Sequence, residues 1–513
     1  MITRLPYTMA VMTRNSSAQS PAFGIAMALA LFASSACGSD LQSRDYASGL
    51  RRSVVLEGAE PKRFSIQDRM THYGIPGASV AVVEGCRVVD ARAFGNATPA
   101  GRQVTTGTQF QAGSVSKVVT AAGALVLVDD GALSLDDDIM PKLRGWSLPR
   151  PAPYEQGAVT LRHLLTHSAG LGVAGFKGYL IGSPLPSLVQ VLDGEAPANT
   201  APVRLVDAPG AGWRYSGGGF VLTQKLMEDA SGRAFQDLMH DRVLQPAGMG
   251  RSSFAPAVDP ARAIEPAHGT LADGTPIPGG WRLYPEQAAA GLWTTPSDLA
   301  SFGIALIKAL HGEEPAFLSK KTASDMMRRQ VGDWGLGLEI SRDGSPKKIS
   351  HTGAPVGYRT LWMMFPETCQ GAVIMTNSDE GMTFTYEVAR ALADAFHWPD
   401  KMPSDASPSV VMTPGIASSF AGTYQLRDFP TERFEVELQQ DGTVTWARQG
   451  RGRRALEAVN AGRLISPDSG MQLVARERDH GSGQVMLLDL HFPGGINVAE
   501  RVITPLHQAP QHK

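Results

Sequence analysis

Ser114 and Lys117 are a serine and a lysine three residues apart, at the start of a long apolar run. On a helix, side chains at this spacing lie on one face, one turn apart. Ser114 would then lie at the positive end of the helix dipole, where developing negative charge is stabilised. Burial in the apolar helix would lower the pKa of Lys117, so that its amine could act as a base. The pair therefore predicts an activated serine nucleophile.

A serine-x-x-lysine pattern alone is weak evidence for catalysis. A second copy, Ser345 to Lys348, lies in a loop rich in glycine and proline with no helix behind it. An isolated copy is more typical of a capped helix with a solvated lysine. The sequence has no H-E-x-x-H, no Walker A motif and no G-x-S-x-G elbow. The G-x-G-x-x-G of residues 170–175 follows a helix-like segment instead of a strand, so it does not predict dinucleotide binding.

The elements that must position this pair are strands and helices of an α/β domain, predicted over residues 56–398. Residues 78–83 and 87–94 are strand-like on either side of a Glu-Gly-Cys turn, which predicts a hairpin. Residues 117–128 are apolar nearly all round, which predicts a buried helix. Capping residues predict helices over 161–167 and 299–310, and apolar runs predict strands over 338–340, 360–365 and 371–376.

The composition changes toward the C-terminus. Residues 399–415 are rich in Pro, Ser, Asp and Thr, which is typical of a linker. Beyond them apolar and charged residues alternate between Phe434 and Leu438, and Asp441-Gly442 is a strong hairpin signal. Residues 416–513 are therefore predicted to form a small antiparallel β domain.

The N-terminal residues have the pattern of a secretory signal. The first 20 residues carry two arginines and no acidic residue, and residues 21–36 are almost continuously apolar. That run is shorter than the ~20 residues needed to cross a bilayer. A basic start, a short apolar run and small residues at its end favour a signal peptide over a buried helix. We predict a signal peptide over residues 1–36 and a polar tether over residues 37–55.

Cys37 follows the apolar run directly. The sequence Ser34-Ser-Ala-Cys37 resembles a bacterial lipobox, although Ser34 stands where these boxes usually carry Leu. Cys37 is therefore predicted as a lipid anchor. Ordinary cleavage beside an incidental cysteine is the alternative.

The composition excludes several classes of protein. The chain has 513 residues, 43% hydrophobic and 19% charged, which excludes a wholly disordered chain and predicts two or three folded units. The net charge is −2 and no run of like charge occurs, so no nucleic-acid partner is expected. Three cysteines are too few for a disulfide scaffold or a cysteine-rich zinc site. Neither a metal nor a cofactor is predicted.

Seven short motifs, taken in chain order, carry a resemblance to a known family. In that order they resemble the serine β-lactamase and penicillin-binding family, within it the class C-like branch that includes D-alanyl-D-alanine carboxypeptidases and esterases. The resemblance implies an antiparallel sheet flanked by helices, with a C-terminal β domain similar to the lipocalin-like appendages of some members. The motifs are Ile75–Val82, Gln109–Lys117, Leu133–Asp137, Leu164–Leu171, Tyr215–Gly217, Ala290–Leu299 and His351–Gly353.

The resemblance implies catalytic roles for three side chains. Ser114 would attack the acyl carbonyl, and Lys117 would accept its proton. Tyr215 would protonate the leaving group and later activate water. For that role the pKa of Tyr215, ordinarily ~10, would have to fall, and a neighbouring ammonium would lower it.

The His351–Gly353 motif would complete the site. The backbone N–H groups of Ser114 and Ala354 would form the oxyanion hole, with Ala354 directly after the motif. His351 would belong to the catalytic centre, and Thr352 and Gly353 would contact the substrate.

Two departures from the family's pattern bear on the substrate. Gly217 stands where β-lactamases carry Asn, which removes a hydrogen-bonding partner and is expected to widen the substrate pocket. His351 replaces the usual Lys, so its positive charge would be partial at neutral pH. Both changes disfavour β-lactam hydrolysis as the main activity. His167 is expected to be structural, packing the end of a helix.

The resemblance also suggests a disulfide. Cys86 and Cys369 each fall in a hairpin turn. In the family's sheet the first and last strands are antiparallel neighbours, which would bring these turns together. A disulfide between them is a hypothesis that requires an oxidising compartment.

Together these patterns predict a serine hydrolase that acts on esters or amides through a covalent acyl-enzyme. A D-alanyl-D-alanine carboxypeptidase or a β-lactamase proper are alternatives, and a penicillin-binding sensor without turnover is an alternative of another class. The expected partner is a small-molecule or peptide substrate, with membrane attachment through a lipidated N-terminus. The expected location is the periplasm, free or membrane-anchored. The C-terminal domain is predicted to shape or cap the mouth of the site.

Overall fold

The computed structural model describes residues 44–60, 62–254, 266–342, 344–427, 433–448, 451–492 and 495–502. The predicted signal peptide and the predicted lipid anchor Cys37 lie outside these residues. Within the described ranges, no helix combines the length and the apolar character needed to span a membrane.

A six-stranded sheet with the strand order β3-β2-β11-β10-β9-β8 runs through the first domain, and all its neighbours pair antiparallel. The prediction of an antiparallel sheet is therefore confirmed. Its strands are β2 (Gly77–Glu84), β3 (Arg87–Gly95), β8 (Glu339–Ile340), β9 (Ile349–Gly353), β10 (Arg359–Phe365) and β11 (Gln370–Thr376).

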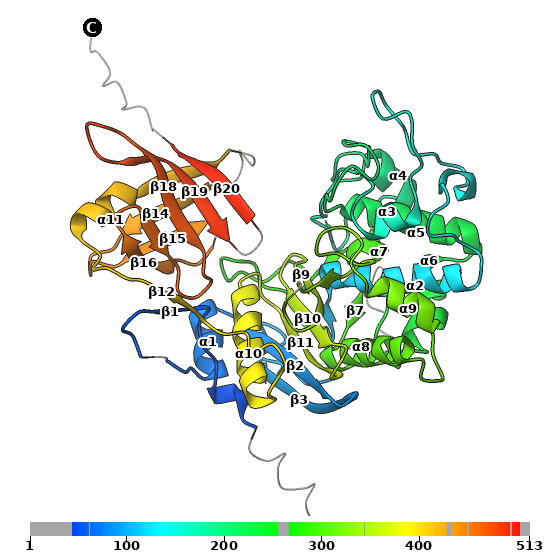
Figure 1. Ribbon diagram of the computed structural model, residues 1–513, viewed down its shortest axis with the longest axis horizontal. Helices are drawn as coiled ribbons and strands as arrows, with labels where there is room; N and C mark the ends of the chain where they lie inside the picture. Colours follow the sequence, from blue (N-terminus) through cyan, green and yellow to red (C-terminus); the bar gives the residue numbers. More distant parts are fainter. Residues whose placement is uncertain are drawn as a thin grey trace, which may run out of the picture. The chain divides into compact units, whose positions relative to one another are not determined.

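Helices cover both faces of this sheet (Figure 1). Successive side chains of a strand point to opposite faces. In β2, Val80 packs in the core that includes residues of α1 (Ile66–Tyr73) and α10 (Gly381–Ala395). Its neighbour Ala81 packs in the core that includes residues of α8 (Pro296–His311). Burial on both faces explains why β2 is apolar almost throughout instead of alternating.

A lobe of helices lies beside the sheet, around the buried helix α2 (Ser116–Asp129). Residues 116–127 of α2 are all buried, which confirms the helix predicted from its apolar run. Helices α5, α6, α7 and α9 pack around it, so every side of α2 meets protein. The lobe includes α3 (Leu161–Leu165), α4 (Leu188–Asp193), α5 (Gly217–Ser231), α6 (Phe235–Met239), α7 (Gln287–Ala290), α9 (Lys320–Met326), and the strand pairs β4 (Phe110–Gln111) with β7 (Trp293–Thr294) and β5 (Tyr179–Leu180) with β6 (Arg282–Leu283).

The C-terminal strands form a closed eight-stranded antiparallel barrel, which confirms the predicted antiparallel β domain. The first and last strands pair with Tyr424 opposite Arg501, so the described barrel leaves no unpaired edge. Helix α11 (Pro414–Phe420) packs Phe420 into the barrel core. The strands are β13 (Gly422–Leu426), β14 (Arg433–Leu438), β15 (Val444–Arg448), β16 (Arg454–Asn460), β17 (Arg463–Ile465), β18 (Gln472–Arg478), β19 (Val485–Phe492) and β20 (Gly495–Arg501).

Parts of the segments predicted as a tether, residues 37–55, and as a linker, residues 399–415, pair with each other as strands. Strand β1 (Val54–Leu56) pairs in parallel with β12 (Asp405–Ser407). Backbone N–H and C=O groups form such a ladder whatever the side-chain composition, which is why composition missed it.

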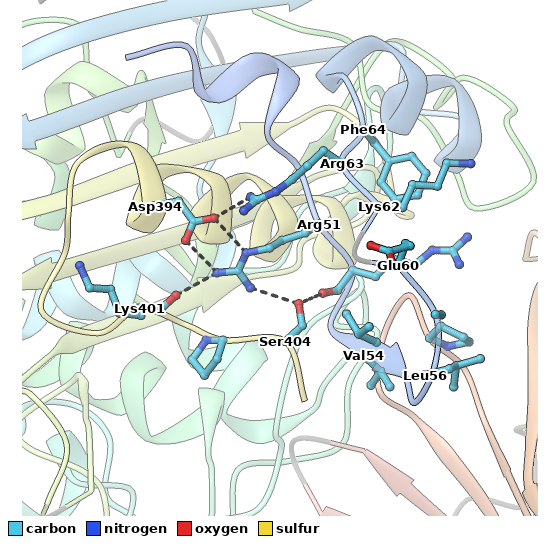
Figure 2. A pocket seen from close by; sticks show the side chains of 15 residues that line it. Arg51, Val54, Leu56, Glu60, Lys62, Arg63, Phe64, Asp394, Lys401 and Ser404 are labelled. Carbon is cyan, nitrogen blue, oxygen red and sulfur yellow. Dashed lines mark hydrogen bonds and ion pairs between the residues drawn. The ribbon is translucent and has the colours of Figure 1, made fainter. Parts of the chain in front are cut away.

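The residues before β1 are also packed on the sheet domain. Tyr46 is 1% exposed and Leu50 is fully buried. Arg51 donates to the carboxylate of Asp394 on α10 (Figure 2). The folded domain therefore begins about ten residues earlier than the predicted boundary at residue 56.

Buried ion pairs join the barrel to α1 and α10. Arg69 of α1 donates to Glu387 Oε1 of α10 at 2.6 Å and to Asp468 Oδ1 at 2.8 Å, in the loop between β17 and β18. Arg454 of β16 donates to Glu380 Oε2 at 2.5 Å. None of these residues is a predicted site residue, and the role of the barrel at the site mouth stays a prediction.

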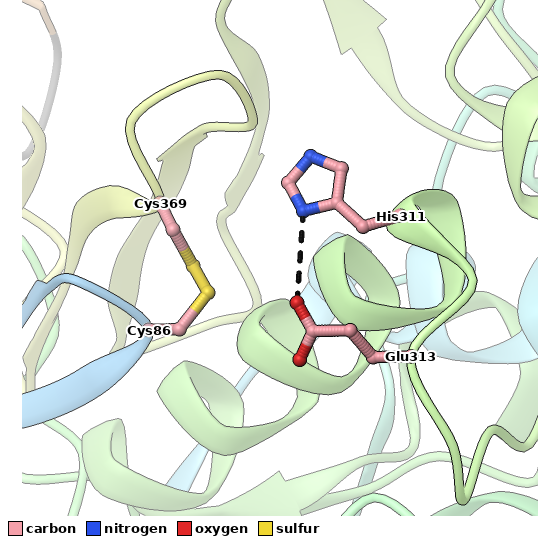
Figure 3. Close-up of a disulfide and its surroundings, with 4 residues drawn as sticks. All are labelled: Cys86, His311, Glu313 and Cys369. Atoms are coloured by element: carbon pink, nitrogen blue, oxygen red, sulfur yellow. Dashed lines mark ion pairs between the residues drawn. A yellow bond between two sulfur atoms is a disulfide. The ribbon is translucent and has the colours of Figure 1, made fainter.

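The structure joins Cys86 and Cys369 in a disulfide (Figure 3). Cys86 lies in the β2–β3 turn and Cys369 in the β10–β11 turn, with their Cα atoms 5.0 Å apart. Because β2 and β11 are antiparallel neighbours, the two turns lie at the same end of the sheet. The end of α8, with the His311–Glu313 ion pair, lies close by.

Candidate active site

The start of α2 places Ser114 and Lys117 together. Ser114 lies in the 3₁₀ turn η3 (Gly113–Val115) and Lys117 in the first turn of α2. Lys117 Nζ lies 3.1 Å from Ser114 Oγ and donates to the carbonyl of Ala289 on α7 at 2.7 Å. Lys117 is 1% exposed, and burial without a counter-charge lowers its pKa to about 7. The arrangement provides a partly deprotonated amine beside a serine hydroxyl.

Two glycines let the end of β9 approach η3 closely. A side chain on Gly353 would place its Cβ 1.9 Å from the carbonyl oxygen of Ala112. Gly113 has φ of +54°, and a Cβ there would lie 2.3 Å from Cδ of Pro355. Only residues without a Cβ allow this contact, so the His351–Gly353 strand and the nucleophile turn are in direct contact.

That contact brings the two predicted oxyanion donors to the same place. Ser114 lies in the first helical turn, where backbone N–H groups have no partner within the helix. Ala354 is the first residue after β9 and lies beyond Gly353, the last residue paired with β10. Both amides therefore lie beside this contact, and their role as oxyanion donors stays a prediction.

Tyr215 lies in a loop that ends at α5, and its neighbours fix it. The backbone N–H of Arg214 donates to the carbonyl of His167 at 2.7 Å, and that of Ser216 donates to His167 Nδ1 at 3.1 Å. Ser216 also caps α5 through a hydrogen bond from Gly219 N. The Tyr215 ring lies 5.3 Å from Lys117 Nζ.

The pKa of Tyr215 differs from the expectation. Burial raises it to about 12, although a hydrogen bond with the Ser114 side chain acts in the opposite direction. The neighbouring Lys117 does not lower it, so the expected fall of this pKa does not occur. The Tyr215 hydroxyl is therefore protonated at neutral pH.

His167 positions Tyr215, which is more than the helix-end packing expected of it. Its ring lies 4.3 Å from that of Tyr215, and its φ of +58° is unusual for a residue other than glycine. Because Nδ1 accepts from Ser216, Nε2 carries the proton, and it has no partner in the described part of the chain. Burial holds its pKa well below the usual value. The Leu164–Leu171 motif contained this residue without revealing its role.

His351 is neutral, which corrects the prediction of a partial positive charge. Its Nδ1 donates to the carbonyl of Thr352 at 2.6 Å, and the side chain is 4% exposed. Burial, with a smaller contribution from Lys117, lowers its pKa to about 3. Its Nε2 is then a buried acceptor without a partner among the described residues.

Gly217 does not widen the site as expected. A Cβ at Gly217 would lie 2.9 Å from the carbonyl oxygen of Ala174 and 2.9 Å from the ring of Phe176. The loop containing these two residues therefore occupies the space beside Gly217. The site therefore lacks the amide group that the Asn of β-lactamases supplies, and it gains no space in exchange.

Two aromatic residues lie at the site and a buried carboxyl lies directly before α7, and sequence reasoning missed all three. Trp334 stacks on Trp213 with ring centroids 5.7 Å apart, and its ring lies 5.5 Å from that of His351. Trp213 is 47% exposed. Glu286, directly before α7, is fully buried with both carboxylate oxygens unpartnered in the described structure, and burial raises its pKa to about 7. They come from separate loops, and no local spacing links them to Ser114.

The described residues contain no group of three side chains that could hold a metal ion. The groups that they do bring together are a hydroxyl, a buried amine and a phenol. This set is suited to acyl transfer through a serine nucleophile.

Known proteins share this sequence pattern and fold. The beta-lactamase family model matches residues 65–396. Penicillin-binding protein 4* of Bacillus subtilis is 25% identical over 396 residues, covering 71% of this chain and 82% of that protein. Esterase EstB of Burkholderia gladioli is 31% identical over 368 residues, covering 63% and 90%. The solved octameric penicillin-binding protein homologue from Pyrococcus abyssi has a TM-score of 0.57 at 24% identity, covering 84% of this chain and 98% of that one.

The family match spans well over half of the chain and contains every predicted catalytic residue. The solved homologue extends the likeness of fold over most of the chain. This protein belongs to the beta-lactamase family of serine hydrolases.

Proposed function

We propose that this protein hydrolyses an ester or amide through a covalent acyl-enzyme on Ser114, with Lys117 as base and Tyr215 as acid. The observation that carries the proposal is the 3.1 Å distance from Lys117 Nζ to Ser114 Oγ, combined with a Lys117 pKa of about 7. At that pKa about half of the Lys117 side chains are free amines at neutral pH. The likeness to an esterase and a penicillin-binding protein supports the same chemistry.

The acylation step follows from the positions of these groups. Ser114 Oγ attacks the substrate carbonyl carbon while its proton passes to Lys117 Nζ. The N–H groups of Ser114 and Ala354 stabilise the oxyanion that forms. As the bond to the leaving group breaks, the Tyr215 hydroxyl donates its proton to that group and regains one from the Lys117 ammonium. Lys117 ends as a free amine and Tyr215 as a neutral phenol.

Deacylation uses Lys117 as the base. Because the pKa of Tyr215 is about 12, its phenolate form is rare at neutral pH. The attacking water therefore gives its proton to the Lys117 amine, and the ammonium returns it to Ser114 Oγ when the acyl bond breaks. This replaces the water-activating role that the family resemblance implied for Tyr215.

A neutral ester is the substrate class that the site favours. The neutral His351 offers no charge to the carboxylate of a β-lactam. Gly217 offers no amide to its side chain, and the Ala174 carbonyl and the Phe176 ring fill the space next to it. Both features weaken β-lactam recognition more than ester recognition.

The test compares a p-nitrophenyl ester, a chromogenic cephalosporin and a D-alanyl-D-alanine peptide. We expect the ester to be hydrolysed with the highest kcat/KM, and Ser114→Ala to lower kcat/KM by ~10³-fold or more. Ser345→Ala removes the serine of the second serine-x-x-lysine copy and is expected to leave turnover unchanged. Retained turnover in Ser114→Ala would refute the nucleophile. A single stoichiometric burst without turnover would identify a sensor instead of a hydrolase.

We also propose that the protein acts outside the cytoplasm, as the N-terminal pattern predicts. The Cys86–Cys369 disulfide supports this, because such bonds persist mainly in oxidising compartments. The intact mass of the protein from its native cells tests it. A chain that begins at an acylated Cys37 or just after residue 36 is expected, and a chain that retains Met1 would contradict the proposal.

A further inference from the structure

A cavity of about 470 Å³ is lined by residues within 51–60, by residues 62–64, by Asp394, Lys401, Pro403 and Ser404, and by Pro467 (Figure 2). None of the predicted catalytic residues lines it. Its volume is within the range of small-molecule pockets. The wall consists of β1, the segment that leads from β1 to α1, and the chain that follows α10.

Two arginines at this cavity share one carboxylate. Arg51 Nε donates to Asp394 Oδ2 at 3.1 Å, and Arg63 Nη1 donates to the same oxygen at 2.6 Å. Arg51 also donates to the carbonyls of Lys401 and Met402, each at 2.9 Å. These bonds hold Arg51 in place, and the group as a whole keeps an excess of positive charge.

Further cations at the cavity are not neutralised. Lys62 and Lys401 are exposed, and their ammonium groups make no hydrogen bond or ion pair with the described residues. Arg52 also lines the cavity and pairs with Asp468 at 2.8 Å. Glu60 is the second acidic residue of the lining, beside five basic ones. In a chain of net charge −2, this concentration of positive charge indicates an anionic ligand.

The same cavity has an apolar wall. Val54, Leu56 and Phe64 line it, together with Pro403 and Pro467. A small inorganic anion would leave this wall in contact with water. An anion attached to an alkyl chain would cover the wall and meet the cations at once.

We propose that this cavity binds the headgroup of an anionic membrane lipid. Lys62 and Lys401 lie toward opposite ends of the cavity (Figure 2) and both attract the phosphate, and the wall around Leu56 and Phe64 contacts the glycerol and the first acyl carbons. Basic side chains near an anionic leaflet are attracted to it, and apolar burial adds to that attraction. Only seven residues lie between the predicted lipid anchor Cys37 and Asp45, so a lipidated chain would stay near such a surface.

Vesicle binding of the full chain carrying Cys37→Ser tests the proposal without a covalent lipid. The N-terminal segment then contributes equally to every variant. Sedimentation with phosphatidylcholine vesicles, with and without phosphatidylglycerol, is expected to show ~10-fold tighter binding to the anionic vesicles. Lys62→Glu with Lys401→Glu is expected to remove this preference. Lys62→Gln with Lys401→Gln is expected to weaken it by a smaller factor.

Lys142→Glu with Lys308→Glu is the matched control, because it makes the same charge change at two exposed lysines outside the cavity. It is expected to keep the preference, and all variants are expected to keep their ester hydrolysis. An equal loss in the control pair would overturn the proposal in favour of net charge alone. Equal binding of the Cys37→Ser chain to neutral and anionic vesicles would also overturn it.

Soluble competitors separate a lipid from a free anion. Dihexanoylphosphatidylglycerol is expected to displace the Cys37→Ser chain from anionic vesicles at a concentration at least ~10-fold below that of glycerol 3-phosphate or inorganic phosphate. Equal competition by inorganic phosphate would assign the cavity to a free anion and overturn the lipid proposal.

Discussion

Lys117 and Arg69 are both buried cations, 1% and 2% exposed, but they meet different surroundings. Lys117 bonds to neutral oxygens such as the Ala289 carbonyl, and burial lowers its pKa to about 7. Arg69 bonds to the carboxylates of Glu387 and Asp468, and its pKa is raised in spite of its burial. Removal from water is common to both sites, and the counter-charges decide the outcome.

The comparison teaches what each site can do. A buried amine without a counter-charge releases its proton near neutral pH and can serve as a base. A buried guanidinium with two carboxylates keeps its charge and holds α1, α10 and the barrel together. Glu286, buried without a partner near α7, follows the same rule with the opposite sign, because burial raises its pKa to about 7.

Lys117→Met is expected to have the largest effect and to separate the two sites most clearly. It should lower kcat/KM for a p-nitrophenyl ester by ~10³-fold or more, since the base is lost. Its melting temperature should stay equal or rise, because an uncompensated buried charge is removed. Lys225→Met is the matched control, because Lys225 is 8% exposed and paired with Asp229. The control should keep its activity and melt lower. Near-normal turnover in Lys117→Met would contradict the conclusion that this buried amine serves as the base.

Arg69→Met is the converse experiment. It leaves the buried Glu387 carboxylate without its cation, while Asp468 keeps Arg52 and His72, and it should lower the free energy of unfolding by about 3–5 kcal/mol. kcat/KM of the folded protein should stay within about twofold of the original, because Arg69 contacts no predicted site residue. Arg233→Met breaks the exposed pair with Asp241 and should cost at most about 1 kcal/mol. Urea unfolding measures both variants, and similar losses would contradict the distinction between buried and exposed pairs.

The pH dependence measures the pKa of Lys117 directly. Only the free amine is a base, so kcat/KM should rise about tenfold per pH unit below pH 7 and level off above it. A pKa lowered on folding also means that the folded state binds fewer protons between about pH 7 and the ordinary lysine pKa near 10.4. Stability should therefore rise with pH across that window, and this rise should be absent in Lys117→Met.

Glu286→Gln is the control for this profile, because the carboxyl of Glu286 titrates in the same range. The rise of kcat/KM up to about pH 7 should persist in this variant. Its disappearance would assign the titrating group to Glu286 instead of Lys117.

Trp213→Ala is expected to have the smallest effect. It tests an aromatic ring contact, whereas the variants above test buried charges. Trp213 is 47% exposed and stacks on Trp334, with its ring 6.4 Å from that of Tyr215. Because Tyr215 protonates the leaving group in the proposed mechanism, an aromatic leaving group should lie against Trp213. KM for an aryl ester should rise by about three- to tenfold, with little change for a methyl ester. Trp213→Phe should restore most of the loss, and an equal change for both esters would exclude a leaving-group contact.

Much of the fold was predictable because it depends on patterns short enough to read along the chain. The apolar run of α2 predicted a buried helix, and the two-residue period after residue 433 predicted antiparallel strands. The β1–β12 pair was not predictable, because its two strands are about 350 residues apart and their pairing depends on the backbone. The closure of the barrel likewise depends on where β20 meets β13.

The candidate site likewise has one part that the sequence predicts and another part that only the fold determines. Ser114 and Lys117 lie one helical turn apart, so their contact follows from spacing. His167 and Trp334 reach the site from separate loops, and only packing brings them there. Their residue types alone carried no signal of that position.

The covalent order of the residues was enough to predict a nucleophile with its amine partner and to identify the family, because these depend on residue type and local geometry. The sequence alone did not determine the protonation states of these side chains. Burial lowers the pKa of His351 to about 3, raises that of Tyr215 to about 12 and lowers that of Lys117 to about 7. A pKa depends on how much water and how many opposite charges surround a group in three dimensions, and distant segments of the chain supply both.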